Sequence, residues 1–411
     1  MKKFLLIAVG LAVVVALFLF FRTLTSSPGQ ETESEQVAET EESEETASQE
    51  SGVEESSDEA VAGGSIESSF EEYNPLTLVQ SVEITPDDDY EIGAFCRVYY
   101  DEERSEFLTT FGTGQAGGGT SGYVGGGEGG QGSVYKYYSD DLEETGESAY
   151  YIQGGGDLAT IVVGDYLYHL TGGSVGWKLA KFDLQTWQEV DRVDIALEAD
   201  EGANDQMLAY ANGMLIASSA KAANAFGGDT AGNTAPKADP TVGIYTHHHA
   251  FDLDLNPKGE WALEDTRHAN GSSLVFVDGV YQFVTTTAYF GDLQVLQYDE
   301  DWNYLGTKML IKKAQWPQGT EYDEETGQYY IAYLAIEGGG RSETRLAVFD
   351  KEWNLLSNTA VTDYGREFFA GRPSVKLFGD YVYVTYDKES MNATTKEWNR
   401  DWQCQMSVYE K

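Results

Sequence analysis

The feature that most constrains the fold is a unit that recurs along most of the chain. Each copy has an apolar strand ending in an aromatic residue, then Asp or Ser, a short polar turn, and a Leu or Trp. The clearest copies start at residues 134, 179, 248, 296 and 346, and a shortened copy, CQMSVYEK, ends the chain. Each copy predicts a β-hairpin in which the Asp caps the turn and the Leu or Trp begins the returning strand.

A second kind of hairpin lies between successive copies of the first. It has an apolar strand, a turn often built on Gly-Asp, and a Tyr-rich strand, and its copies start at 157, 205, 272, 320 and 373, with a looser one at 93. The two hairpins together give four strands in about fifty residues, which is the size of a propeller blade. The segments lack the 3.6-residue period of helices, so an all-β fold is predicted.

The ends of the repeat region indicate how the blades are arranged. Six inner hairpins occur, but only five outer strands follow them, and residues 76–85 (LTLVQSVEIT) have the character of the missing one. If this segment pairs with the terminal strand at 404–409, the two ends of the domain close a ring without an open edge. Over residues 75–411 the pattern therefore resembles the β-propeller superfamily, which implies a six-bladed propeller. No signature of a named branch is present, so the resemblance implies no function.

The amino-terminal segment has a different character. Residues 4–21 are 18 uncharged, mostly apolar residues behind Lys2 and Lys3. As a helix they would extend about 27 Å, close to the thickness of a bilayer core. Residues 1–22 are therefore predicted to be a signal anchor, a single transmembrane helix with a cytoplasmic amino terminus. A cleaved signal peptide is the alternative, although no A-x-A pattern follows the apolar run.

Charge separates a linker from the folded domain. Residues 23–74 contain 16 acidic residues and no Lys or Arg, which predicts a disordered acidic linker. The whole chain has a formal net charge of −43, and residues 75–411 alone carry −30. Such a charge disfavours nucleic acid as a partner. The predicted localisation is the cell membrane, with the propeller on the extracytoplasmic side.

Candidate binding residues lie where chain segments enter the inner strands. In propellers these loops share one face with the loops between the second and third strands, and one of the latter, residues 112–132, contains 12 glycines. No Lys-Ser or Lys-Thr follows that stretch, so neither a phosphate loop nor a cofactor is predicted. The predicted ligand-binding residues are Arg267, His268, Asn270, Trp316, Gln318, Arg366 and Arg372. Their mixed chemistry suits a polar ligand such as a glycan or a protein segment, and favours a recognition module.

A hydrolase is the alternative function. Carboxylates at inner-strand entrances resemble the pattern of arabinanase-like propeller glycosidases, and this resemblance implies acid, base or orienting roles for Asp157, Asp205 and Glu321. Those enzymes have five blades rather than six. A glycosidase needs two carboxyl groups roughly 5 to 10 Å apart in one pocket.

The histidines and cysteines are candidates for a metal site and a disulfide. In an extended strand His247 and His249 share one face while His248 points away, so at most two of them join one site, and no metal site is predicted. Cys96 and Cys404 fall in the blades on either side of the ring closure. A disulfide between them would reinforce the ring, but the required Cα separation below about 7 Å is not fixed by the sequence.

Overall fold

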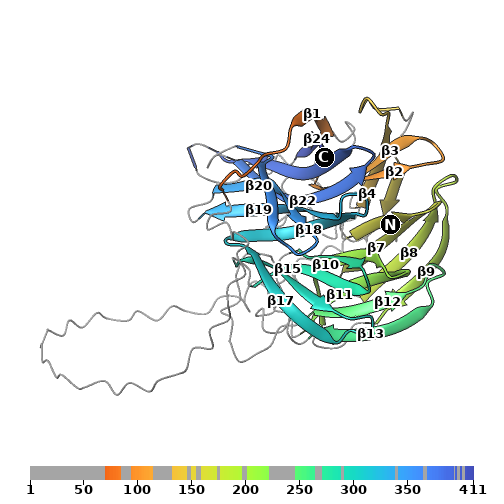
Figure 1. Ribbon diagram of the computed structural model, residues 1–411. Coiled ribbons are helices and arrows are strands. Elements are labelled where there is room, and N and C mark those ends of the chain that lie inside the picture. Colours follow the sequence, from red (N-terminus) through yellow and green to blue (C-terminus); the bar gives the residue numbers. More distant parts are fainter. Residues whose placement is uncertain are drawn as a thin grey trace, which may run out of the picture. The chain divides into compact units, whose positions relative to one another are not determined.

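A computed structural model describes most of the repeat region. The described residues are 70–84, 94–113, 132–145, 150–153, 159–173, 176–196, 201–221, 246–263, 271–287, 291–337, 341–363, 368–392, 394–395, 399 and 403–411. Within them, 24 strands form six four-stranded antiparallel sheets and no helix occurs (Figure 1). The predicted all-β fold with six blades is confirmed.

Each blade is one sheet, numbered here in chain order. Blade 1 consists of β2 (Ala94–Asp101), β3 (Glu106–Thr113), β4 (Gly132–Tyr138) and β5 (Tyr150–Gln153), and blade 2 of β6 (Ala159–Val163), β7 (Tyr166–Gly173), β8 (Gly176–Asp183) and β9 (Glu189–Ile195). Blade 3 consists of β10 (Glu201–Ala211), β11 (Met214–Lys221), β12 (Thr246–Phe251) and β13 (Pro257–Leu263), and blade 4 of β14 (Ser273–Val277), β15 (Val280–Thr286), β16 (Leu293–Tyr298) and β17 (Tyr304–Ile311). Blade 5 consists of β18 (Ala314–Asp323), β19 (Gln328–Glu337), β20 (Arg341–Asp350) and β21 (Leu355–Ala360), and blade 6 of β22 (Phe368–Phe378), β23 (Tyr381–Ser390), β24 (Gln403–Glu410) and β1 (Leu78–Ile84).

The inner strands close into a ring. In chain order β2, β6, β10, β14, β18 and β22 each contact the next, and β22 contacts β2. The closure joins the two ends of the domain, because β1 pairs with β24 as the outer strand of blade 6 (Figure 1). Ser81 lies opposite Ser407, with their hydroxyl oxygens 3.1 Å apart, and Ile84 lies opposite Cys404. The predicted pairing of the terminal strands is therefore confirmed.

Residues 70–73, which precede β1, form hydrogen bonds with blade 5. Tyr73 and Asn358, in β21 of blade 5, exchange backbone hydrogen bonds of 3.0 and 2.7 Å. The Asn358 side-chain amide donates to the Glu71 carbonyl at 2.6 Å, and Arg345 donates to the Phe70 carbonyl at 2.7 Å. These contacts begin upstream of residue 75, where the sequence pattern places the start of the domain. The chain thus lies along the edge of blade 5 before it enters blade 6.

The core is divided among the blade interfaces. Six clusters of buried apolar residues occur within the described residues, and each lies between two consecutive blades. Alternation along β19 shows how one strand serves two of them. Tyr329, Ile331 and Tyr333 pack toward blade 4, whereas Tyr330 and Ala332 pack toward blade 6. Successive side chains of a strand point to opposite faces of the sheet, so a strand covered on both faces is apolar at every position.

The turns between the third and outer strands explain the recurring Asp and Trp. In blade 5, Asp350 accepts hydrogen bonds from the backbone N–H groups of Glu352 and Asn354, at 3.0 and 2.8 Å, so the predicted cap is confirmed. The predicted place of Trp353 is wrong. It does not begin the returning strand but lies in the turn at φ 66°, stacked on Tyr329 with ring centroids 4.0 Å apart. The equivalent residues with positive φ are Leu142, Trp187, Leu255 and Trp302.

In the described part of the chain, no helix has the length and apolarity needed to span a bilayer. The predicted signal anchor at 1–22 and residues 23–69 of the predicted linker lie outside the described residues.

Candidate functional site

Four inner strands share an irregularity near their amino-terminal ends. Pairing with the second strand of the blade shifts between Ala94 and Arg97 in β2, Gly202 and Met207 in β10, Gln315 and Gly319 in β18, and Gly371 and Ser374 in β22. The inner strand of each blade runs in the same direction along the propeller axis. The bulges, which lie near the amino-terminal ends of these strands, therefore lie toward one end of the axis. Bulges redirect side chains and are frequent beside functional sites.

The bulges of blades 5 and 6 bring an aromatic and a cationic side chain together. Trp316 and Arg372 both have φ 48°, a left-handed conformation that is unfavourable for bulky residues. The guanidinium carbon of Arg372 lies 5.7 Å from the centroid of the Trp316 ring. This is within the range of a cation–π interaction. Two backbone positions that are unfavourable by about 1–3 kcal/mol each are therefore held by the surrounding structure.

Arg372 is fixed from its other side by Asp387. Its Nη1 donates to Asp387 Oδ2 at 2.8 Å, and the Asp387 side chain is 0% exposed. The register of β22 and β23 explains the pair, since Gly371 lies directly opposite Asp387. A buried carboxylate that lost this partner would destabilise the fold by about 3–5 kcal/mol. The ion pair therefore orients the guanidinium beside the Trp316 ring.

The bulge in β18 also packs against the entrance of blade 4. Gly271 has φ 70°, and a Cβ added there would lie 2.5 Å from Cγ of Gln318 and 3.2 Å from Cα of Trp316. Glycine is therefore required at this contact. Within the described residues, Gln318 Oε1 and Gln315 Nε2 are buried without a hydrogen-bond partner. We call Gln315, Trp316, Gln318 and Arg372 the axial bulge site.

Glu321, a carboxylate of the hydrolase hypothesis, is occupied by a structural contact. It forms an ion pair with Lys376 of β22, and the two residues link the inner strands of blades 5 and 6. Burial lowers the pKa of Lys376, but the charge of Glu321 opposes this, and the net pKa lies above its usual range. Asp157 lies outside the described residues, and Asp205 is in β10 with its side chain outside them.

The predicted ligand-binding residues divide into two groups. Trp316, Gln318 and Arg372 gather in the axial bulge site, whereas Arg267, His268, Asn270 and Arg366 lie outside the described residues. Sequence reasoning missed Gln315, Lys376 and Asp387. Lys376 is a charged residue between Val375 and Leu377, and that contrast is the signal that marks it in the sequence, whereas Asp387 begins a polar run in β23 and has no such signal.

The two cysteines lie in the same part of the core. Both are thiols in this structure and both are buried in the cluster between blades 6 and 1, together with Ile84 and Met406. The Cys96 carbonyl accepts a hydrogen bond of 2.7 Å from the Thr385 hydroxyl of blade 6. A disulfide between Cys96 and Cys404 stays a prediction.

Comparison with known proteins gives similar folds but no family. No family model and no curated protein matches the chain. Among solved structures, a subtype N11 neuraminidase-like protein of A/flat-faced bat/Peru/033/2010 (H18N11) is similar, with 11% identity and a TM-score of 0.48, covering 82% of this chain and 95% of that one. A subtype N10 neuraminidase-like protein of A/little yellow-shouldered bat/Guatemala/060/2010 shows 10% identity and a TM-score of 0.46, covering 82% and 99%. These similarities assign no function to the chain.

Proposed function

We propose that this protein is a recognition module that binds a polar ligand, a glycan or a peptide segment, at the axial bulge site. The observation that carries the proposal is the pairing of Trp316 and Arg372, two bulky residues in left-handed conformations on adjacent bulges. Unfavourable backbone conformations persist where the surrounding structure holds them, and they cluster at binding sites.

The chemistry of the site supports a polar ligand with an apolar face. A half-buried indole ring offers a flat surface for stacking, and the fixed guanidinium of Arg372 offers hydrogen-bond donors. Gln318 is also half-buried, so its side chain adds a polar amide beside the ring.

The net charge of the propeller limits which classes of ligand can bind. Residues 75–411 carry a formal net charge of −30, so polyanions are repelled before they reach the site. Neutral glycans and basic peptides are not. Recognition is favoured over hydrolysis because Glu321 is held in an ion pair with Lys376.

The amino-terminal segment supports a location for this activity. Residues 1–22 as a signal anchor and residues 23–69 as an acidic tether would present the propeller outside the membrane, where glycans and secreted proteins are accessible. Protease added to intact cells should remove the propeller and leave a membrane-bound stub. A propeller that is protected until the cells are opened would contradict this location.

Binding screens on the full chain in detergent test the proposed site. The protein is screened against neutral glycans and basic peptides, and any ligand found is titrated into Trp316→Ala and Gln318→Ala. We expect each substitution to weaken binding at least about tenfold, equivalent to roughly 1.4 kcal/mol. Tyr304→Ala is the matched control, because Tyr304 is an exposed aromatic residue on the outer strand β17. A ligand that binds both site variants as tightly as the parent chain would remove the axial bulge site from consideration.

A further inference from the structure

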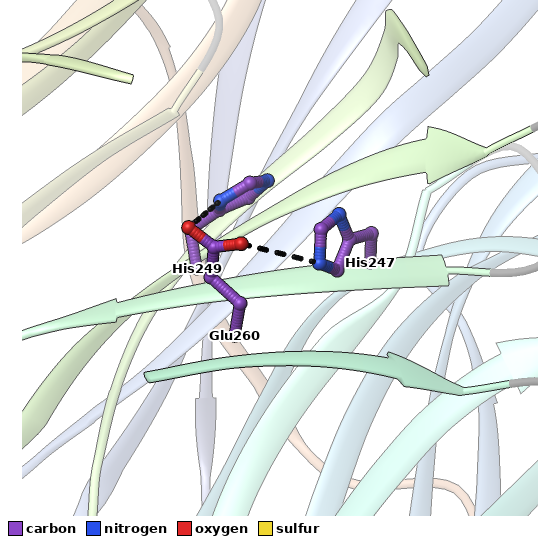
Figure 2. A group of neighbouring side chains, drawn as sticks. All are labelled: His247, His249 and Glu260. Carbon is purple, nitrogen blue, oxygen red and sulfur yellow. Dashed lines mark ion pairs between the residues drawn. The ribbon is translucent and has the colours of Figure 1, made fainter. Parts of the chain in front are cut away.

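Blade 3 carries a cluster of nitrogen and oxygen atoms that the axial bulge site does not use. His247 and His249 lie on β12, and Glu260 lies on the outer strand β13, directly opposite His249 (Figure 2). His248, between them, packs against Phe283 and Trp302 of blade 4. The strand alternation therefore directs His247 and His249 to the other side of the sheet, toward blade 2, where Phe251 packs with Tyr168 and Leu170.

The three side chains converge on one point. Figure 2 shows the two oxygens of the Glu260 carboxylate directed toward the two imidazoles, and one oxygen lies 3.9 Å from His247 Nε2 and the other 3.7 Å from His249 Nδ1. The imidazole centroids are 4.4 Å apart, and the three ligand atoms all lie within 4.8 Å of one another. Both nitrogen–oxygen distances exceed the 2.7–3.2 Å of a hydrogen bond. The carboxylate is thus held near both rings without a hydrogen bond to either of these nitrogens.

These distances are close to those of a tetrahedral metal site. Metal–ligand bonds of about 2.0–2.1 Å place the ligand atoms roughly 3.3 Å apart. The side chains of His247 and His249 are 5% and 3% exposed, so the surrounding protein fixes them, whereas the Glu260 side chain is 65% exposed and can move inward. The exposed carboxylate also gives an ion a route to the buried nitrogens.

We propose that His247, His249 and Glu260 bind a divalent transition-metal ion such as Zn²⁺. Two imidazole nitrogens and one carboxylate oxygen suit zinc and its neighbours, whereas Ca²⁺ and Mg²⁺ prefer oxygen ligands. Three protein ligands leave a fourth position for water. A bound ion ties β13 to β12 and stabilises the outer half of blade 3. The proposal is independent of ligand recognition at the axial bulge site.

Zinc titration of the full chain in detergent tests the site. The protein is freed of metal with a chelator, the chelator is removed, and Zn²⁺ binding is followed by calorimetry, with Co²⁺ as a spectroscopic probe of tetrahedral nitrogen ligation. We expect one equivalent to bind, a tenfold excess of Mg²⁺ to leave it bound, and the midpoint of thermal unfolding to rise with Zn²⁺. His247→Gln and His249→Gln should abolish this binding, and Glu260→Gln should weaken it at least about tenfold.

A matched control separates this site from the many surface carboxylates. Glu300→Gln removes an exposed carboxylate from a turn of blade 4 that contributes none of the three proposed ligands, and should leave zinc binding unchanged. The buried histidine variants are first checked for folding by circular dichroism. If they do not fold, the exposed Glu260→Gln variant decides. Absence of stoichiometric zinc binding in the parent chain, or equal affinity in Glu260→Gln and Glu300→Gln, overturns the proposal.

Discussion

The bulky residues with positive φ in this propeller include two sets, one in the turns before the outer strands and one at the bulges of the inner strands. In the turns the conformation repeats from blade to blade, and the residue packs into the apolar cluster between its own blade and the preceding one. Trp302 stacks on Tyr281 with ring centroids 4.0 Å apart, as Trp353 does on Tyr329. Stacking and burial thus offset the unfavourable backbone at these repeated positions.

In the bulges the same conformation occurs at equivalent positions of two adjacent blades, the first residue after the shift in pairing of β18 and of β22. Trp316 at φ 48° is only half-buried, and its neighbour Arg372 is held by an ion pair with Asp387 rather than by aromatic stacking within a blade. A repeated conformation that is compensated by packing indicates a structural role. One that is held by an ion pair beside a half-buried aromatic ring favours binding. This difference in what holds the conformation is the physical basis for placing the site at the bulges. Three experiments test it, and a fourth tests a buried histidine between blades 1 and 2.

The largest expected effect is in the turns. Trp353→Ala removes a buried ring from the interface of blades 4 and 5, and should lower the free energy of unfolding by about 3–5 kcal/mol. Urea denaturation measures this change. Ligand binding at the axial bulge site should persist in the fraction that remains folded, because Trp353 belongs to the turn and not to the inner strands. A loss below about 1 kcal/mol would show that packing does not compensate the turn conformation.

The ion pair beneath the bulge should show strong coupling. Arg372→Ala leaves the buried Asp387 carboxylate without its cation and should destabilise the protein by about 3–5 kcal/mol. Adding Asp387→Asn removes the buried charge and should restore a large part of that loss. A double-mutant cycle measured by denaturation separates the coupling from the single effects. Additive effects of the two substitutions would mean that Asp387 does not hold Arg372 in place.

Acid should weaken the blade interfaces through a buried histidine. His169 accepts or donates a 2.7 Å hydrogen bond with the Tyr135 hydroxyl of blade 1, and burial lowers the pKa of His169 from 6.5 to about 4. Between about pH 6.5 and 4, the unfolded chain therefore binds a proton at His169 that the folded protein does not bind. Stability is complete above about pH 6.5 and falls as the pH drops toward 4, by up to about 1.4 kcal/mol per pH unit.

Unfolding free energies measured from pH 7.5 to 4.5 check this expectation. His169→Gln removes the titrating group, so its stability should depend less steeply on pH than that of the parent chain over this interval. Parallel curves for the two proteins would show that His169 does not titrate as its burial indicates.

The sequence predicts the features of the fold that depend on local residue patterns. It does not predict those that depend on tertiary contacts. Blade number and ring closure were predictable because a two-residue period and turn residues are local, and residues 76–85 carry the pattern of an outer strand. The bulges were not, because they depend on contacts such as Gly319 against Val375, where an added Cβ would lie 2.5 Å from the backbone nitrogen.

The histidine cluster shows the same limit at a single position. Alternation alone predicts that His247 and His249 share a face, and the structure has them so. The alternation does not predict which residue of β13 lies opposite each histidine, because the pairing of β12 with β13 shifts between Ala250 and Phe251. That shift in turn sets which residue of β13 lies opposite His249, and the residue is Glu260.

The smallest expected change in stability gives the sharpest test of the comparison. Trp316→Gly removes the ring and also relieves the positive φ, because glycine adopts that conformation without a Cβ clash. These effects oppose each other, so the free energy of unfolding should change by about 1 kcal/mol or less. Ligand binding should nevertheless be lost. Trp353→Gly is the matched control, since the same backbone relief cannot replace a ring stacked on Tyr329, and that variant should remain strongly destabilised. If both glycine variants lost stability equally, Trp316 would be another structural residue and the axial bulges would no longer differ from the turns.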